Sequence, residues 1–295
     1  MPTYRLVLRP LVAALIAVVA ACQARAGEMT WIMPDFPPAG IIVNGKPSNG
    51  ISDQVVKYIV SQWPQATHRY MYANPKRVWT MLAAGQNACL AGALRTPERE
   101  RLVYFRNVNL LVPPEVIVRP ESLPSVPVSA GKVDPAALMR APGLRGVVIE
   151  RRAYGGSIDT LLSRRETSAN VAREAVGSYG RNIFQMLALG RADYTIDYDF
   201  TLAYEMQKNP ALAKLKIVPL LDTEPFVVGA VACPRTAWGL TAIRKIDAIL
   251  GTPEGAAVAA HAQYQWMTQS TLLRYREQMK DFFKKLDRAD PAGFK

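Results

Sequence analysis

A segment that occurs twice constrains the fold more than any other feature of this chain. Residues 78–85 (VWTMLAAG) and 183–190 (IFQMLALG) lie 105 positions apart, and each runs into a short apolar stretch. Apolar residues three and four positions apart predict a helix, and a glycine in the left-handed conformation commonly ends one. A helix that leads into a strand, present twice, predicts two similar α/β lobes with a cleft between them.

The N-terminus has the pattern of an export signal. Arg5 and Arg9 precede an unbroken apolar run at 11–21, and Ala24-Arg25-Ala26 supplies the small residues that a signal peptidase requires. The apolar run is too short to span a bilayer comfortably. We therefore expect the signal to be cleaved before Gly27, which gives a soluble protein in the periplasm.

The three cysteines leave two questions open. Val19-Ala20-Ala21-Cys22 resembles a lipoprotein signal, and lipidation of Cys22 is an alternative to cleavage before Gly27, although it leaves only a tight tether before the first expected strand. After cleavage Cys89 and Cys233 remain. This even number fits either one disulfide in an oxidising compartment or two buried thiols.

The net charge is basic but does not select a partner. Loss of Arg5, Arg9 and Arg25 with the signal lowers the formal net charge from +12 to +9. A moderate basic excess favours anionic partners. The basic residues are scattered, without the dense runs or interleaved aromatic residues of a nucleic-acid binder, so we expect no nucleic-acid partner.

Sequence motifs of common enzymes are missing. The two histidines, His68 and His261, have no cysteine or carboxylate at metal-ligand spacing beside them, so a zinc site and a histidine-based triad both lack their parts. The chain contains no Gly-x-Ser-x-Gly, Walker or Gly-x-Gly-x-x-Gly motif. We expect no catalytic residues, no metal and no cofactor, although paired carboxylates can act without leaving a motif.

Strands and helices are expected to alternate along the mature chain. Strand-like segments occur at 30–33, 88–94, 116–118, 146–149 and 194–196, with helical patterns between them. A proline-rich stretch at 120–127 predicts a linker or an exposed loop, and from Thr236 onward the pattern is helical. This alternation predicts the α/β class with mostly parallel sheets.

Several segments, taken in order, resemble one protein family. They are Trp31-x-x-x-Asp35-Phe36-Pro37-Pro38, Asn49-Gly50-Ile51-Ser52-Asp53, the helix that ends at Gly85, Ala91-Gly92-Ala93-Leu94-Arg95-Thr96-Pro97-Glu98-Arg99, and Gly190-Arg191-Ala192-Asp193-Tyr194. In this order they resemble a family 3 periplasmic solute-binding protein, the group that holds the polar amino-acid receptors of ABC importers. Thr96-Pro97-Glu98-Arg99 after a strand is the most specific piece.

This resemblance implies an α/β, two-lobed type 2 periplasmic binding protein with a ligand cleft between the lobes. It also implies that the strands of Cys89 and Cys233 are neighbours, so we expect a disulfide between these cysteines. The expected parts are a signal peptide at 1–26, a first lobe at 27–118 and 227–270, a second lobe at 119–226, and a C-terminal helical tail at 271–295.

The family's ligand contacts carry over to particular residues. Its arginine in the Thr-x-x-Arg turn grips the ligand's carboxylate, which assigns that role to Arg99; an ion pair of Arg99 with Glu98 or Glu100 is the alternative. Amides at a helix start hold the same carboxylate from the second lobe, and here they belong to Gly155, Gly156 and Ser157. The rest of the cleft would be lined by Phe36 and Tyr154 as aromatic walls, with Asp35 and Asp197.

Two departures from the family pattern limit the choice of ligand. Family members often place a hydroxyl residue two positions after the strand glycine, where this chain has Leu94. Amino-acid receptors place an acid near the end of the second-lobe strand to hold the ligand's ammonium, and that position falls on Tyr198, between Asp197 and Asp199. An α-amino acid is therefore not assured, and another small anion fits equally well.

The expected function is the binding of a small anionic or zwitterionic, amino-acid-like solute by a monomer in the periplasm. The solute would be delivered to an inner-membrane permease of an ABC importer or to a sensor. An enzyme on the same fold is the alternative, a dehydratase or lyase that uses a cleft carboxylate such as Glu150, Asp197 or Glu224.

Overall fold

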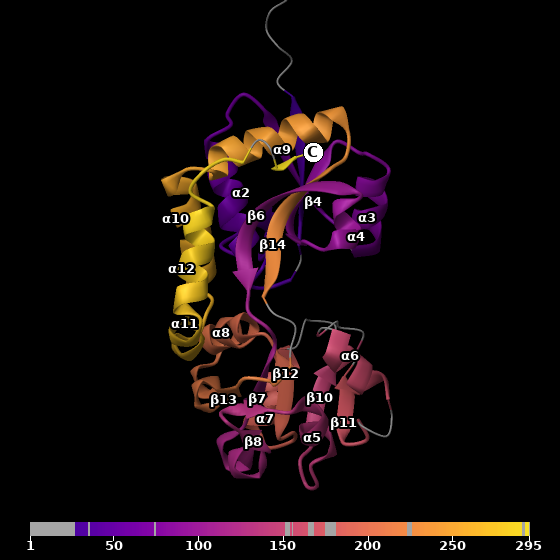
Figure 1. Ribbon diagram of the computed structural model, residues 1–295, viewed down its shortest axis with the longest axis vertical. Helices are drawn as coiled ribbons and strands as arrows, with labels where there is room; N and C mark the ends of the chain where they lie inside the picture. Colours follow the sequence, from indigo (N-terminus) through magenta and orange to yellow (C-terminus); the bar gives the residue numbers. More distant parts are fainter. Residues whose placement is uncertain are drawn as a thin grey trace, which may run out of the picture.

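The computed structural model describes residues 27–34, 36–73, 75–150, 154, 156–164, 168–174, 181–222, 226–290 and 293–294. The expected signal peptide at 1–26 and Cys22 lie outside these residues. The described chain forms two lobes, each built on a five-stranded sheet (Figure 1). None of the helices in this part of the chain is long and apolar enough to cross a membrane.

The first lobe is built on a mixed sheet with the strand order β4-β1-β5-β14-β6. β1 runs parallel to β4 and β5, whereas β14 runs antiparallel to β5 and β6. The strands are β1 (Glu28–Met33), β4 (Thr67–Tyr72), β5 (Ala88–Leu94), β6 (Val103–Leu111) and β14 (Val227–Pro234). A small hairpin of β2 (Ile42–Val43) and β3 (Lys46–Pro47) lies outside this sheet.

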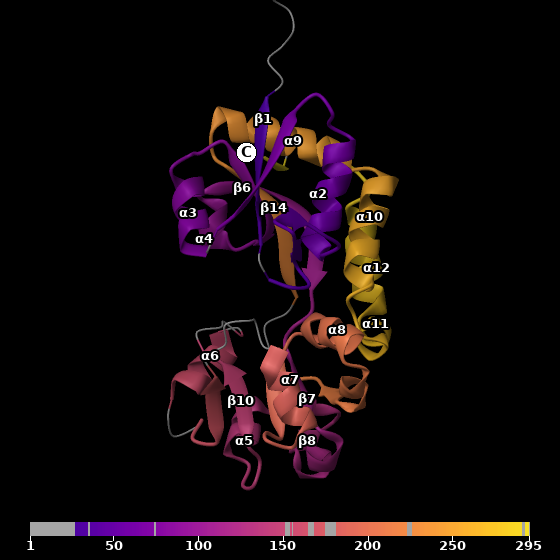
Figure 2. The ribbon, with the colours of Figure 1, turned by 180° about the vertical axis from the view of Figure 1, so that it is seen from behind.

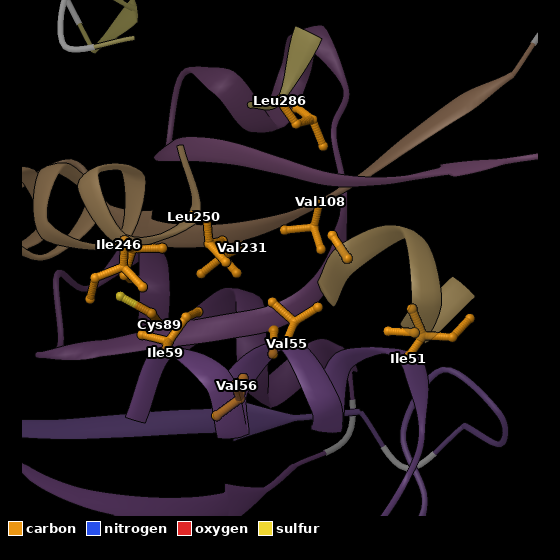
Figure 3. Close-up of a cluster of buried hydrophobic side chains, with 14 of the residues drawn as sticks. Ile51, Val55, Val56, Ile59, Cys89, Val108, Val231, Ile246, Leu250 and Leu286 are labelled. Carbon is orange, nitrogen blue, oxygen red and sulfur yellow. The ribbon is translucent and has the colours of Figure 1, made fainter. Parts of the chain in front are cut away.

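Helices cover both faces of the first sheet. Successive side chains of a strand point to opposite faces of the sheet, and both faces of this sheet are apolar. Met29, Trp31 and Met33 of β1 join the core under α2, α9 and α10, whereas Ile32 joins the core under α3. Figure 3 shows the first of these cores, with α2 and α9 side chains meeting the sheet around Cys89. The helices of this lobe are α2 (Ile51–Ser61), α3 (Pro75–Ala83), α4 (Pro97–Glu100), α9 (Ala237–Leu250) and α10 (Pro253–Tyr264).

The second lobe repeats this plan with the strand order β11-β10-β12-β7-β13. β10 is parallel to β11 and β12, and β7 is antiparallel to β12 and β13. The strands are β7 (Glu115–Val118), β10 (Gly146–Ile149), β11 (Val171–Glu174), β12 (Tyr194–Asp197) and β13 (Lys216–Val218), with a hairpin of β8 (Val128–Ser129) and β9 (Lys132–Val133). The helices are α5 (Pro135–Arg140), α6 (Gly156–Ser163), α7 (Arg181–Ala188), α8 (Asp199–Lys208) and the 3-10 helices η1 (Pro120–Ser125) and η2 (Pro210–Lys214).

The duplicated segment occupies equivalent places in the two lobes. α3 leads into β5 and α7 leads into β12, and each strand lies third in its sheet between a parallel and an antiparallel neighbour. Gly85 and Gly190 both have positive φ, and the next residue in each case donates its backbone N–H to a helix carbonyl, that of Met81 or Met186. The prediction of two similar α/β lobes is confirmed.

The lobe boundary expected after residue 118 needs correction. β7 pairs with β12 and β13 and therefore lies in the second sheet. A short apolar strand does not reveal which sheet it joins, and the chain crosses to the second lobe at 112–114, directly after β6. The proline-rich stretch, expected to be a linker or exposed loop, forms η1 instead, in which Ser122 Oγ donates to Asp193.

The C-terminal tail is not a separate appendage. It forms α11 (Gln269–Arg274) and α12 (Arg276–Lys285), and Met279 and Phe283 of α12 are buried in the main core of the first lobe. α10, α12 and α11 form a column along the first lobe that reaches α8 of the second lobe in both views (Figure 1 and Figure 2).

Acidic side chains are buried where this column meets the second lobe. Glu115, at the start of β7, forms an ion pair with Arg274 and accepts a hydrogen bond from Thr271 Oγ1 at 3.3 Å. Only 1% of Glu115 is exposed. Burial raises the pKa of Glu115 to about 7; the Arg274 charge lowers it and the neighbouring Asp199 charge raises it.

Cys89 on β5 and Cys233 on β14 form a disulfide, as the resemblance implied. Their Cα atoms lie 4.4 Å apart because the two strands are adjacent, although 144 positions separate the cysteines in sequence. The bond closes a loop that contains the whole second lobe.

We predict that removing this disulfide destabilises the protein substantially. Cross-linking so long a loop restricts the unfolded chain, and loss of such a bond costs about 2–5 kcal/mol of unfolding free energy. Urea unfolding of the Cys89→Ala/Cys233→Ala variant should show this loss. Reductant should destabilise the wild type by a similar amount and leave the variant unaffected; equal stability of wild type and variant would contradict the prediction.

The raised pKa of Glu115 predicts a pH-dependent stability. The pKa of Glu115 is about 7 in the folded protein and 4.5, the usual value, in the unfolded chain. Below pH 4.5 the carboxyl is protonated in both states and the unfolding free energy keeps its full value. Part of that free energy is lost as the pH rises through 7. Glu115→Gln should remove this dependence, which amounts to about 3 kcal/mol at most.

The measurement is urea unfolding of wild type and variant at pH 5 and pH 8. Groups that do not interact with Glu115 affect both proteins equally. Asp281→Asn, at an exposed acid on α12, is the control and should follow the wild type. Parallel pH profiles for wild type and Glu115→Gln would refute the prediction.

Candidate ligand site

Arg99 is held at the end of β5 by local structure. Thr96 caps α4, accepting the Arg99 backbone N–H on Oγ1 at 3.3 Å, and Pro97 begins the helix. The side chain turns back toward the strand, where Nη1 donates to the Leu94 carbonyl at 3.0 Å. The guanidinium lies over the ring of Trp79 from α3, with Cζ 4.3 Å from the ring centroid. These contacts fix a cation without using up its donors.

No carboxylate neutralises Arg99 among the residues that the structure describes. Glu100, one of its two expected alternative partners, pairs with Arg95 instead, at 2.6 Å between Nε and Oε1. Glu98 is exposed, and its charge attracts the guanidinium, although the two do not form an ion pair. Burial lowers the pKa of the Arg99 guanidinium, which nevertheless stays charged at neutral pH. The result is a partly desolvated cation suited to an external anion.

The start of α6 lies at the end of the second lobe that points toward the first lobe. α4 occupies the opposing end of the first lobe, and the two views agree on this arrangement (Figure 1 and Figure 2). Gly156 begins the helix, and the exposed Ser157 donates its hydroxyl to the Asp222 carbonyl at 3.4 Å. Gly155 lies outside the described residues. The site's two predicted halves thus come from facing ends of the lobes.

Tyr154 does not form an exposed aromatic wall. Its side chain is 2% exposed and belongs to the core of the second lobe, and its hydroxyl accepts the Ile149 backbone N–H at 2.8 Å. Its own backbone N–H donates to Asp159 at 2.9 Å. Sequence reasoning missed this because an aromatic residue before a helix serves packing as readily as binding.

Phe36 makes an aromatic contact between the two lobes. Its ring meets Phe200 edge to face at 6.2 Å between centroids, and Phe200 stacks on Tyr198 at 5.2 Å and an interplanar angle of 9°. Phe36 follows β1 in the first lobe, whereas Tyr198 and Phe200 lie at the start of α8. Phe36 therefore contacts an aromatic side chain at the start of α8 in the second lobe. Asp35 lies outside the described residues.

The acids on either side of Tyr198 are buried. Asp197 is 1% exposed and its Oδ1 accepts the Tyr198 backbone N–H at 2.6 Å. Asp199 is fully buried and accepts two hydrogen bonds from Thr268, from the backbone N–H at 2.8 Å and from Oγ1 at 2.5 Å. Asp197 thus does not present an open carboxylate. Of the other acids considered for catalysis, Glu150 is exposed and Glu224 lies outside the described residues.

Sequence reasoning missed Glu115 and Arg274, which meet across 159 positions of the chain. The available signal was a glutamate directly before an apolar strand, in Glu115-Val116-Ile117-Val118, but its partner could not be read from the sequence.

Comparisons with known proteins establish the fold. No protein-family model matches this chain, and no curated protein does. Many solved structures match. An L-cystine ABC transporter protein from Listeria monocytogenes is 19% identical with a TM-score of 0.56, covering 83% of this chain and 97% of that one. An ancestral arginine-binding protein bound to arginine is 16% identical with a TM-score of 0.57, covering 83% and 100%.

A third structure is the periplasmic VFT2 domain of BvgS from Bordetella pertussis, 18% identical with a TM-score of 0.54, covering 89% of this chain and 100% of that domain. Likeness at this level of identity concerns architecture. Together with the paired sheets described above, it shows that the chain has the two-lobed α/β fold of type 2 periplasmic binding proteins.

Proposed function

We propose that this protein binds a small anionic or zwitterionic, amino-acid-like solute between its two lobes. The observation that carries the proposal is Arg99, a positioned guanidinium that pairs with no carboxylate of the described chain and stands on the end of the first lobe that faces the second. A planar guanidinium suits a carboxylate because it offers paired, charge-assisted donors in a fixed geometry.

The start of α6 supplies the second half of the proposed anion site. The first N–H groups of a helix have no partner within the helix, and the helix dipole favours negative charge there. Gly156 and Ser157 bring these groups to the end of the second lobe that faces α4. An anion held from both lobes stabilises the form in which they are close, so binding shifts the population toward a closed state.

The side chains around Tyr198 decide which ligands the proposed site can accept. Asp197 and Asp199 are engaged in buried hydrogen bonds, so neither is ready to receive an ammonium group. Phe36 and Tyr198 are partly exposed and can contact an apolar or planar part of a ligand. Carboxylic acids without an α-amino group are therefore candidates alongside amino acids.

Names of the similar structures support two kinds of partner. One is a protein of an ABC transporter, one binds arginine, and one is a periplasmic domain of BvgS. A histidine kinase sensor domain with similarity to periplasmic binding proteins also matches, with 18% identity and a TM-score of 0.50 over 90% of this chain and 96% of that one. We accordingly propose a periplasmic monomer that presents its ligand either to an inner-membrane permease or to a sensor. Permease and ATPase genes beside its own gene would favour the importer.

Calorimetry against a panel of amino acids, dicarboxylates and aromatic acids tests this proposal. Arg99→Ala should weaken binding of the best ligand by about 2–4 kcal/mol, because the ligand charge would be left partly unpaired. Arg101→Ala is the matched control, since Arg101 is exposed at the end of the same helix. Unchanged affinity in Arg99→Ala would refute the assigned site.

A further inference from the structure

The C-terminal column belongs firmly to the first lobe. Gln263 of α10 bonds the edge of β6, with Nε2 donating to the Leu110 carbonyl at 2.6 Å and Oε1 accepting the Leu110 N–H at 3.1 Å. Arg106 of β6 pairs with Asp247 of α9 at 2.8 Å and donates to the Leu286 carbonyl at 2.9 Å. α10 and α12 therefore move with the first sheet.

Residues 268–275, which contain α11 and are called the strap below, extend this column onto the second lobe. Thr268 donates twice to Asp199 at the start of α8. Arg274 pairs with Glu115 of β7, to which Thr271 also donates. Both acids are buried, and removing the partner of a buried charge is costly. The strap thus holds two elements of the second lobe by specific bonds.

Aromatic contacts tie the strap to the connections between the lobes. Tyr275 meets Phe226 edge to face at 5.3 Å, and Phe226 directly precedes β14, where the second crossover ends. Glu115 directly follows the first crossover at 112–114. Just before the strap, Trp266 contacts Tyr204 of α8 at 5.5 Å. The strap therefore acts next to both crossovers.

The strap and the proposed anion contacts, at α4 and the start of α6, lie on opposite sides of the crossovers. In Figure 1 and Figure 2 alike, α8 and α11 are on one side, and α4 and α6 are on the other. When two bodies rotate about a connection between these sides, approach on one side means separation on the other. Movement of α6 toward α4 would then pull α8 away from α11.

We propose that the strap opposes closure of the lobes, so that its bonds to Glu115 and Asp199 set how readily the protein closes around a ligand. Breaking these bonds destabilises the open form, in which the lobes are apart on the side of the proposed anion contacts. A larger fraction of the molecules is then closed. A ligand that prefers the closed form then binds more tightly, because its apparent affinity scales with that fraction. The consequence for affinity rests on the proposed function, whereas the effect on lobe position does not.

Distances between spin labels test the inference without a ligand. Labels at Glu98→Cys on α4 and at Ser163→Cys, the last residue of α6, report the separation of the two lobes on the side of the proposed anion contacts, and both positions are exposed.

The strap variants are Arg274→Gln and the milder Thr268→Val. The valine removes the hydroxyl bond to Asp199 together with the hydroxyl contacts to Ser270 and Thr271 that cap α11, and keeps the backbone bond to Asp199. Arg276→Gln is the matched control, because Arg276 is exposed and lines a groove of the column formed by α10, α11 and α12.

At pH 8, above the pKa of Glu115, both strap variants should add shorter label distances and the control should not. If Arg274→Gln does not fold, as judged by circular dichroism, Thr268→Val decides alone. Unchanged distances in the folded strap variants would overturn the inference, and so would an equal shift in Arg276→Gln.

Calorimetry supplies the binding arm of the test. The best ligand of the panel should bind the strap variants about fivefold or more tightly than the wild type. If the strap variants showed shorter label distances but bound the ligand no more tightly than the wild type, the proposed effect of the strap on affinity would be wrong. Loss of binding in Arg99→Ala concerns the assigned ligand site, whereas the label distances alone decide whether the strap opposes closure.

Discussion

The insertion of β14 between β5 and β6 is the constraint on which the rest of the structure depends. To place this strand, the chain must leave the first lobe after β6, build the second lobe completely, and return. The two lobes are therefore joined by two crossovers, which run next to each other. The disulfide between Cys89 and Cys233 fastens the returning strand β14 to β5.

Repetition of the lobe plan explains where the proposed anion contacts lie. β1 and β5 are parallel in one sheet, as are β10 and β12 in the other. The carboxyl ends of parallel strands share one edge, and ligands of α/β sheets commonly bind there. Arg99 follows β5, and α6 follows β10. Because the crossovers join the lobes with these edges facing, two ordinary loop positions supply the two halves of the proposed site.

Local sequence patterns predicted much of this architecture. They could not predict which distant strands and side chains pair with each other. The 3.6-residue spacing and terminal glycines of α3 and α7 are visible in the sequence. The resemblance to family 3 solute-binding proteins implied neighbouring strands for the two cysteines. The strand at Glu115–Val118 was assigned to the wrong lobe because its four residues carry no mark of their sheet. Tyr154 was misplaced because burial depends on the packing around it.

The central claim is that an anion is held between the lobes by Arg99 and the start of α6. The most direct test is a crystal structure of the protein with the acid that binds it most tightly. The account predicts the ligand's carboxylate within hydrogen-bond distance of both the Arg99 guanidinium and the Ser157 backbone N–H, with α4 and α6 drawn together. A ligand bound elsewhere, or an Arg99 side chain turned away from it, would contradict the account.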